Sequence, residues 1–180
     1  EPYRFNSSLK GRNGVLVAVG TFRGFHDASV GNFDEVYLLD VDSLVAEFNV
    51  KHINFIYNSK DRNDYLVKLF SGTDDPELRD LFVKYESGHY AKDRLLAKIK
   101  SICVANDYNG AKLDGSYVNQ MLRFIADDKI YRNTFLGSDH LFRNLRKKIR
   151  AGKVFVLPGS LSNKKTLPWL GKRIKDRGLE

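Results

Sequence analysis

Three short apolar runs stand out along the chain, at 15–19, 35–42 and 153–160. The first is bounded by glycine on both sides, and its length and β-branched residues predict a strand that is buried on both faces. The second run ends in two aspartates, and the third, also expected to be a buried strand, is interrupted by a Pro-Gly pair. Because helical patterns separate the runs, we expect them to be strands of a mostly parallel sheet.

The residues between these runs follow helical spacing. Leu44, Phe48 and Ile56 recur at helical intervals in a segment that begins at Ser43, a residue suited to cap a helix N-terminus. A shorter helix fits the residues between the first two runs. The middle of the chain, about 60–137, has the pattern of several amphipathic helices.

The end of the chain again combines helical patterns with a short apolar run, as its beginning does. A helix capped by Ser138, with Phe142, Leu145 and Ile149 directed inward, precedes the third run, and a last helix is expected after it. The sequence therefore predicts the α/β fold class. We expect one Rossmann-like, doubly wound domain over 1–180 that carries a helical insertion at about 60–137. One more strand would be expected after the last helix, so the sheet is expected to be incomplete.

The first strand ends in a turn with the chemistry of a nucleoside site. Gly20 and Gly24 let a backbone approach a ligand closely, and Asp40 follows Gly20 by 20 residues, at the end of the next strand. An acid at this place accepts hydrogen bonds from ribose hydroxyls. Asp42 lies on the same strand face and is a second candidate, although Asp40 directly follows the apolar run.

These residues also carry a resemblance to a known family. The segments "VAVGTFRGF" and "VYLLDVDSLVAEFN" resemble the first two strands of class I S-adenosylmethionine-dependent methyltransferases. "KDRNDYLVKLFSG" and "KVFVLPGSLSNKKTLPWLGKRIKDRG" resemble an uncharacterised bacterial group of methyltransferase-like proteins. The resemblance is strong at 15–72 and 138–178, and it implies S-adenosylmethionine or a related adenosyl ligand as the cofactor of a transferase with an unknown methyl acceptor.

The resemblance implies three groups of site residues. The residues implied to contact the adenosyl ligand are Val19, Gly20, Thr21, Phe22 and Gly24. Asp40 or Asp42 is implied to bind the ribose. The residues implied to border the acceptor are Pro158, Gly159 and Ser160.

The sequence departs from the family pattern at two of these places. Ala18 stands where the family has an acid that holds the amino-acid end of the cofactor, and Phe22 replaces the middle glycine. The Asn/Asp-Pro-Pro-aromatic motif of amino-group methylation is missing. Two interpretations follow: a methyltransferase-like domain that binds an adenosyl ligand, or a non-catalytic Rossmann-like scaffold that has lost or changed its ligand, with Phe22 filling the space.

Charge is distributed unevenly along the chain. Its net charge is +8, and residues 143–180 hold twelve Lys and Arg against two acids, so this part carries +10 and the rest −2. Such a basic face either is simply a solvated surface, the favoured interpretation, or binds nucleic acid or an acidic partner with steep salt dependence. The residues proposed for binding are Arg143, Arg146, Lys147, Arg150, Lys164 and Lys165.

Other chemistries find little support in the sequence. It holds no Gly-Lys-Ser/Thr triplet for a P-loop and no G-x-S-x-G nucleophile elbow. The histidines, at 26, 52, 89 and 140, are too scattered for a zinc site, and no metal is expected. His26 and Asp27 are interpreted as a surface pair on a helix, and Phe155 and Trp169 as core.

A reductase that uses a nicotinamide cofactor also finds little support. Tyr108 and Lys112 have the Tyr/Lys spacing of such reductases, but they lie in a turn-like segment and not on the helix that this spacing requires.

No run approaches the roughly 18 apolar residues of a membrane helix. The lone Cys103 excludes an internal disulfide framework, so a cytoplasmic location is the default expectation, with export left open.

Overall fold

The chain divides into two units in the computed structural model, which describes residues 7–88, 91–105, 121–162 and 164–179. The sheet unit comprises Glu1–Tyr57 with His140–Glu180, and the helical unit comprises Asn58–Asp139. The expected insertion at about 60–137 lies within the helical unit.

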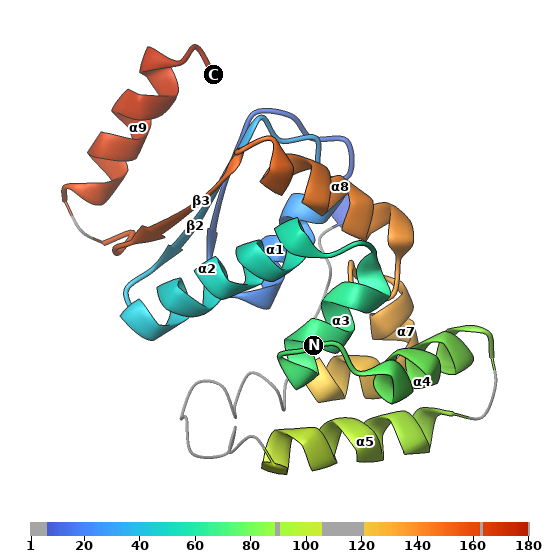
Figure 1. Ribbon diagram of the computed structural model, residues 1–180. Helices are drawn as coiled ribbons and strands as arrows, with labels where there is room; N and C mark the ends of the chain where they lie inside the picture. The colour runs from blue at the N-terminus through green and yellow to red at the C-terminus, as the bar shows by residue number, and fades with distance from the viewer. Residues whose placement is uncertain (1–6, 89–90, 106–120, 163, 180) are drawn as a thin grey trace. The chain divides into compact units, whose positions relative to one another are not determined.

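Each strand of the sheet unit is followed by a helix (Figure 1). In chain order the elements of this unit are a 3-10 turn at Ser7–Leu9, β1 (Val15–Val19), α1 (Phe22–Val30), β2 (Glu35–Asp40), α2 (Ser43–Asn58), α8 (Asp139–Arg150), β3 (Val154–Pro158) and α9 (Thr166–Asp176).

The three strands form one parallel sheet in the order β1-β2-β3. Val19 pairs with Leu39, and Asp40 with Pro158, so the carboxyl ends of all three strands meet at one edge. The α/β class and the parallel pairing are therefore confirmed. Burial on both faces is found for β2, whereas β1 and β3 are only half-buried, contrary to expectation. The reason is that β2 lies between two strands, while β1 and β3 each have one neighbouring strand among the described residues.

The two faces of β2 pack against different helices. On one face Gly24 of α1 lies so close to the sheet that a Cβ atom there would fall 2.6 Å from Leu38 Cδ2 and 3.2 Å from Ala18 Cβ. On the other face the Tyr37 ring stacks on the Phe155 ring, with centroids 5.1 Å apart, and contacts α9. Glycine at 24 thus sets the distance between α1 and the sheet, the helix–strand packing role that glycines have in nucleotide-binding folds.

Two buried histidines belong to the core of the sheet unit. His26 is 3 % exposed and His52 is 1 % exposed, and the His52 ring lies 4.4 Å from the Phe48 ring and 5.5 Å from the Phe25 ring. Burial lowers the pKa of His26 to about 4 and that of His52 to about 3. Asp27 is also buried, at 8 % exposed, so the interpretation of His26 and Asp27 as a surface pair is wrong.

The side of α8 predicted to face inward is confirmed, because Phe142, Leu145 and Ile149 are all buried. Trp169 of α9, expected in the core, is 49 % exposed instead. In the described ranges, no helix combines the length and the apolar character needed to cross a bilayer.

The helical unit surrounds one buried arginine. Its helices are α3 (Arg62–Ser71), α4 (Pro76–Glu86), α5 (Lys92–Ala105), a further helical stretch at 121–126, and α7 (Asp128–Arg132). Arg62, 5 % exposed, bonds both carboxylate oxygens of Glu86 and donates from Nε to Asp139 Oδ1 at 2.7 Å. The Tyr131 hydroxyl donates to Glu86 Oε1 at 2.7 Å. The arginine thereby joins α3, α4 and α7.

Substitution of Gly24 tests the close approach of α1 to the sheet. Gly24→Ala is expected to lower the free energy of unfolding by about 1–3 kcal/mol, because the added methyl group overlaps the Leu38 side chain. Gly171→Ala is the matched control, since a Cβ on this glycine of α9 meets nothing within 4 Å. The control is expected to be neutral or to stabilise by about 0.5–1 kcal/mol. Equal effects in chemical denaturation would contradict this account of the packing.

The buried histidines predict acid sensitivity. Both pKa values are lowered in the folded protein, so the unfolded chain takes up protons first as the pH falls below its ordinary histidine value of about 6.5. Stability is therefore lost between about pH 6.5 and pH 4, by about 1.4 kcal/mol per pH unit for each histidine.

Urea denaturation at a series of pH values measures this loss. His52→Leu is expected to give a shallower decline, whereas the exposed His140→Gln serves as the control and retains the slope of the unaltered protein. A decline as steep in His52→Leu as in the control would remove His52 from the explanation.

Candidate ligand-binding site

The carboxyl edge of the sheet brings the predicted site residues together. We define the carboxyl edge as Val19–Thr21, Asp40–Asp42 and Pro158–Ser160, the residues at and directly after the ends of the three strands. The pairing of Val19 with Leu39 places Gly20 beside Asp40. The Gly159 amide donates to the Asp40 carbonyl at 2.7 Å, which continues the β2–β3 pairing into the third segment.

The turn after β1 is open at its glycine. Gly20 has a φ of +91°, a conformation that favours glycine, and a Cβ built there meets nothing within 4 Å. Its carbonyl accepts a 3.1 Å hydrogen bond from Asn49 Nδ2 of α2. Asn49 is fully buried, and its Oδ1 has no hydrogen-bond partner among the described residues. The turn is thus held from below by α2, while the side of Gly20 on which a side chain would lie remains free.

Two of the residues expected to contact a ligand, Phe22 and Gly24, are instead buried residues of α1. Phe22 is 4 % exposed, and Gly24 lies against Ala18 and Leu38. Little of their surface is therefore available to a ligand, and they act by fixing the turn and the helix that follows it. Val19 and Thr21, which flank Gly20, are exposed and half-buried respectively.

Asp40 and Asp42 have different surroundings, although spacing did not separate them. The Asp40 carboxylate is half-buried, and its Oδ1 accepts a 3.0 Å bond from the Asp42 amide. Its Oδ2 has no hydrogen-bond partner in the part of the chain that the structure describes. Asp42 Oδ1 accepts from the Leu44 amide at 2.9 Å and so caps α2, the role expected of Ser43. Asp40 is therefore the better-placed carboxylate for a ligand.

The third segment supplies a tight turn and no general base. A Cβ on Gly159 would lie 3.2 Å from Thr166 Oγ1 and 3.4 Å from Leu39 Cδ1, so this glycine allows the chain to pass close to its neighbours. The Ser160 hydroxyl lies 2.7 Å from that of Ser162 and accepts from the Ser162 amide. It belongs to a local turn, and Ser162 is its hydrogen-bond partner among the described residues.

Exposed aliphatic side chains accompany the polar groups of the carboxyl edge. They lie at or shortly after the strand ends, and a flat apolar group such as a nucleobase could pack on them. They are Val19, 54 % exposed, Val41, 72 %, Leu44, 51 %, and Leu161, 45 %.

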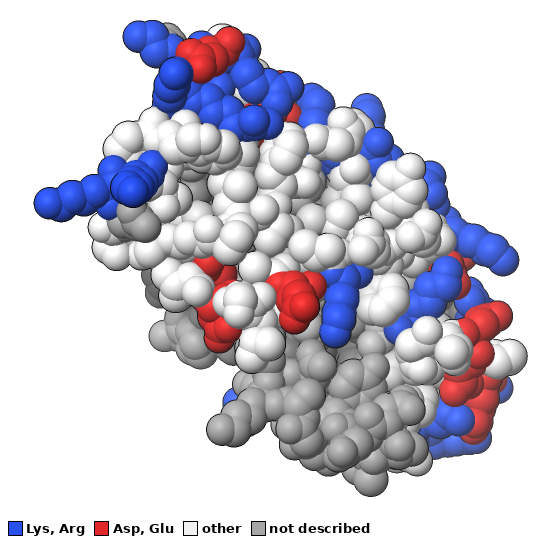
Figure 2. Space-filling view, turned by 60° about the vertical axis from the view of Figure 1, so that its left-hand side comes forward, with Lys and Arg blue, Asp and Glu red and all other residues white. Residues whose placement is uncertain are grey.

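The basic residues expected to form one binding face differ in their surroundings. Arg150 donates from Nε and Nη2 to the Tyr57 carbonyl at 3.3 and 3.1 Å and thus serves the carboxyl-terminal end of α2. Arg146 has a buried Nε, whereas Arg143 and Lys147 are exposed on α8. Lys164 and Lys165 are exposed ahead of α9. Figure 2 shows Lys and Arg side chains in separate groups on the side it presents, with other residues between them.

Two further arginines of the basic region hold α9 to the sheet. Arg173 Nε donates to the Tyr37 hydroxyl at 2.8 Å, and its guanidinium carbon lies 5.2 Å from the centroid of the Phe155 ring. Arg177 pairs with the carboxylate of Glu35, a residue only 3 % exposed. The Tyr37 hydroxyl donates to Glu35 Oε2 at 2.5 Å, which closes the network, and burial raises the pKa of Tyr37. Arg177 thus neutralises an internal acid, and Arg173 is held by the tyrosine that bonds this acid.

A metal site gains no support from the described residues, in which no group of three His, Cys, Asp or Glu side chains is placed to hold a metal ion. His89 and the pair Tyr108 and Lys112 lie outside the described residues.

Sequence reasoning missed some polar residues that the structure brings forward. One of them was Asn49. The signal that could have identified it was a polar side chain on the buried side of α2, one residue after Phe48. Lys148 and Lys153 were two others, and the sequence did not distinguish them from the basic residues around them.

The fold and the carboxyl edge define an α/β protein with a candidate ligand site at the ends of its parallel strands. The chain belongs to the family described as Domain of unknown function (DUF7790), whose model matches residues 2–180. No curated protein matches it.

The arginine network gives a testable expectation. Arg177→Gln is expected to lower the free energy of unfolding by about 1–3 kcal/mol, because the buried Glu35 carboxylate loses its charged partner. Lys172→Gln, an exposed change on the same helix, is the control and should alter stability by no more than about 0.5 kcal/mol. Denaturant titration of both variants measures the difference. If the two proved equally stable, the arginine would not be part of the packing of α9.

Proposed function

We propose that the sheet unit is a methyltransferase-like, Rossmann-like domain that binds S-adenosylmethionine or a related adenosyl ligand at the carboxyl edge. The observation that carries the proposal is the meeting of an open glycine turn and a carboxylate on adjacent parallel strands. Gly20 follows β1, Asp40 ends β2, and the pairing of Val19 with Leu39 makes them neighbours. Ligands of open α/β sheets bind beyond the carboxyl ends of the strands, which is where these residues lie.

The residues present fit the nucleoside half of such a ligand. Asp40 Oδ2 can accept from the ribose hydroxyls, and the exposed Val41 and Val19 offer apolar surface for the base. The space beside Gly20 lets the ligand approach the backbone.

The amino-acid half of S-adenosylmethionine finds fewer partners. Ala18, where the methyltransferases it resembles carry an acid, lies in the contact between β1 and α1, 3.2 Å from the position of a Cβ on Gly24. A larger acidic side chain would not fit there without displacing the helix. We therefore propose that recognition rests mainly on the adenosyl group.

S-adenosylmethionine, when bound, supplies an electrophilic methyl group. The part of this chain would be to hold the ligand and align an acceptor beside Pro158–Ser160. Alignment alone can provide much of the rate enhancement of a group transfer, so the proposal does not require a general base beside Ser160.

The alternative is a non-catalytic module that kept the fold and binds nucleic acid or an acidic partner through exposed basic residues. Arg143, Lys147, Lys164 and Lys165 are exposed and favour it. It predicts salt-sensitive binding that is insensitive to changes at Asp40, whereas the adenosyl proposal predicts the reverse.

Titration calorimetry with S-adenosylmethionine and with adenosine tests the proposal. The unaltered protein is expected to bind both, and Asp40→Asn to bind them at least about tenfold more weakly, which corresponds to about 1.4 kcal/mol. The matched control is Glu47→Gln, an exposed change on α2, which should retain full affinity.

The absence of both heat and a thermal shift at millimolar ligand would overturn adenosyl binding. Undiminished affinity in Asp40→Asn would overturn the role of Asp40. Thermal unfolding of each variant without ligand shows whether a loss of affinity reflects a loss of folding.

A further inference from the structure

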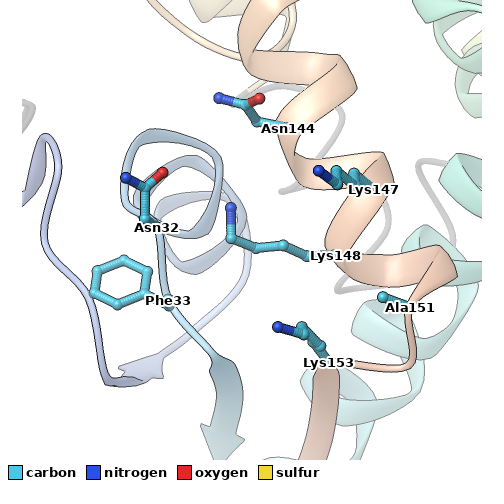
Figure 3. A pocket seen from close by; sticks show the side chains of 7 residues that line it. All are labelled: Asn32, Phe33, Asn144, Lys147, Lys148, Ala151 and Lys153. Carbon is cyan, nitrogen blue, oxygen red and sulfur yellow. The ribbon is translucent and has the colours of Figure 1, made fainter.

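A second concave site lies at the opposite, amino-terminal edge of the sheet. It has a volume of about 220 Å³ and lies between the turn that precedes β2, the end of α8 and the residue that precedes β3 (Figure 3). It is separate from the carboxyl edge, because β2 and β3 run away from it toward Asp40 and Pro158. We call it the lysine pocket. Its lining includes Asn32, Phe33, Asn144, Lys147, Lys148 and Lys153.

Positive charge in the lysine pocket has no counter-charge among the residues that the structure describes. Of these residues, three lysines and no acid line the pocket. Among the described residues, none of the three ammonium groups makes an ion pair or a hydrogen bond. Burial lowers the pKa of Lys148, and the neighbouring charges of Lys153 and Lys147 lower it further. Three cations held near one another without an anion are the arrangement that an oxyanion would stabilise.

The alternative explanation is that these lysines only complement the negative carboxyl-terminal end of α8. It covers Lys147 and Lys148, which lie in the last turn of the helix. It does not cover Lys153, which lies beyond the helix. In Figure 3, Lys148 and Lys153 both extend toward the turn that carries Asn32 and Phe33. The side chains therefore converge on a shared space from two separate elements.

Backbone contacts hold the lysine pocket in place. After α8 the chain reverses at Gly152, which has a φ of +66°, and the Lys153 amide donates to the Lys148 carbonyl at 3.0 Å. The Lys153 carbonyl in turn accepts from the Val36 amide at 2.8 Å, which fixes this lysine to β2. On the other wall, Phe33 is 5 % exposed and packs on Gly31, where a Cβ would overlap its ring. A site built on such supports loses little freedom when a ligand binds.

Asn32 adds amide donors to the ammonium groups, and a second amide, whose nitrogen has partners of its own, lies on the α8 wall. Asn32 is exposed on the turn wall, and Asn144 lies on α8, where its Nδ2 is 3.5 Å from the Ser29 carbonyl and 3.3 Å from His140 Nε2. Amide N–H groups and ammonium groups together provide both the charge and the hydrogen-bond donors that a phosphate oxygen accepts.

We propose that the lysine pocket binds a phosphate or diphosphate group, carried either by a small molecule or by a nucleic-acid backbone. The three ammonium groups match the multiple negative charge of such a group better than the single charge of a carboxylate. The volume is below the range of pockets that enclose drug-sized ligands, so it suits a phosphate head with the rest of the ligand outside. The site is independent of the adenosyl ligand proposed above.

Calorimetric titration with inorganic phosphate, pyrophosphate and a short single-stranded RNA oligonucleotide, at two salt concentrations, tests the proposal. Pyrophosphate or the oligonucleotide is expected to bind, more weakly at the higher salt concentration. The double variant Lys148→Gln/Lys153→Gln is expected to weaken that binding by at least about tenfold, since two of the three charges are removed. Lys51→Gln, exposed on α2, is the control with unchanged affinity.

The outcomes distinguish the two carriers of the phosphate. Binding of pyrophosphate without the oligonucleotide supports a small phosphorylated ligand, and oligonucleotide binding that pyrophosphate displaces supports a nucleic-acid backbone. Failure of all three probes to bind overturns the proposal, as does binding that the double variant leaves intact. The double variant removes mutual repulsion between the lysines, so its thermal midpoint should equal or exceed that of the unaltered protein. A loss of affinity in this variant can therefore be ascribed to the loss of charge.

Discussion

The parallel pairing of β2 with a strand on each side is the constraint on which both candidate sites depend. β2 is buried along nearly its whole length, and its two neighbours come from parts of the chain more than a hundred residues apart. Because parallel strands all point the same way, one edge of the sheet collects three carboxyl ends and the other collects three amino ends. The glycine turn and Asp40 lie at the first edge, and the lysine pocket at the second.

The basic residues of the sheet unit have different structural roles. Arg173 and Arg177 serve an internal tyrosine and a buried glutamate, and Arg150 serves a helix end. The Lys148 and Lys153 side chains have no such partner among the described residues. The number of Lys and Arg residues therefore overstates the positive surface available to a polyanion. Cations that have an internal partner must be distinguished from cations that have none.

The sequence allowed the strands, most of the helices and the meeting of Gly20 with Asp40 to be predicted, because each rests on a local pattern of apolar residues and glycines. It did not allow the burial of β1 and β3 to be predicted, since exposure depends on how many strands flank each one. The contact between Arg173 and Tyr37 joins residues 136 positions apart, and no local pattern encodes it. Asp40 and Asp42 could be separated only once the backbone showed which of them caps α2.

The division of the sheet unit into two segments has a consequence for the order in which the protein folds. Glu1–Tyr57 and His140–Glu180 are interrupted by the helical unit, which is continuous in sequence. During synthesis the helical unit can complete its contacts before β3 and α9 have been made, whereas β2 must wait with one side unpaired and Glu35 without its arginine. Chaperone binding to nascent chains is therefore expected to centre on β2.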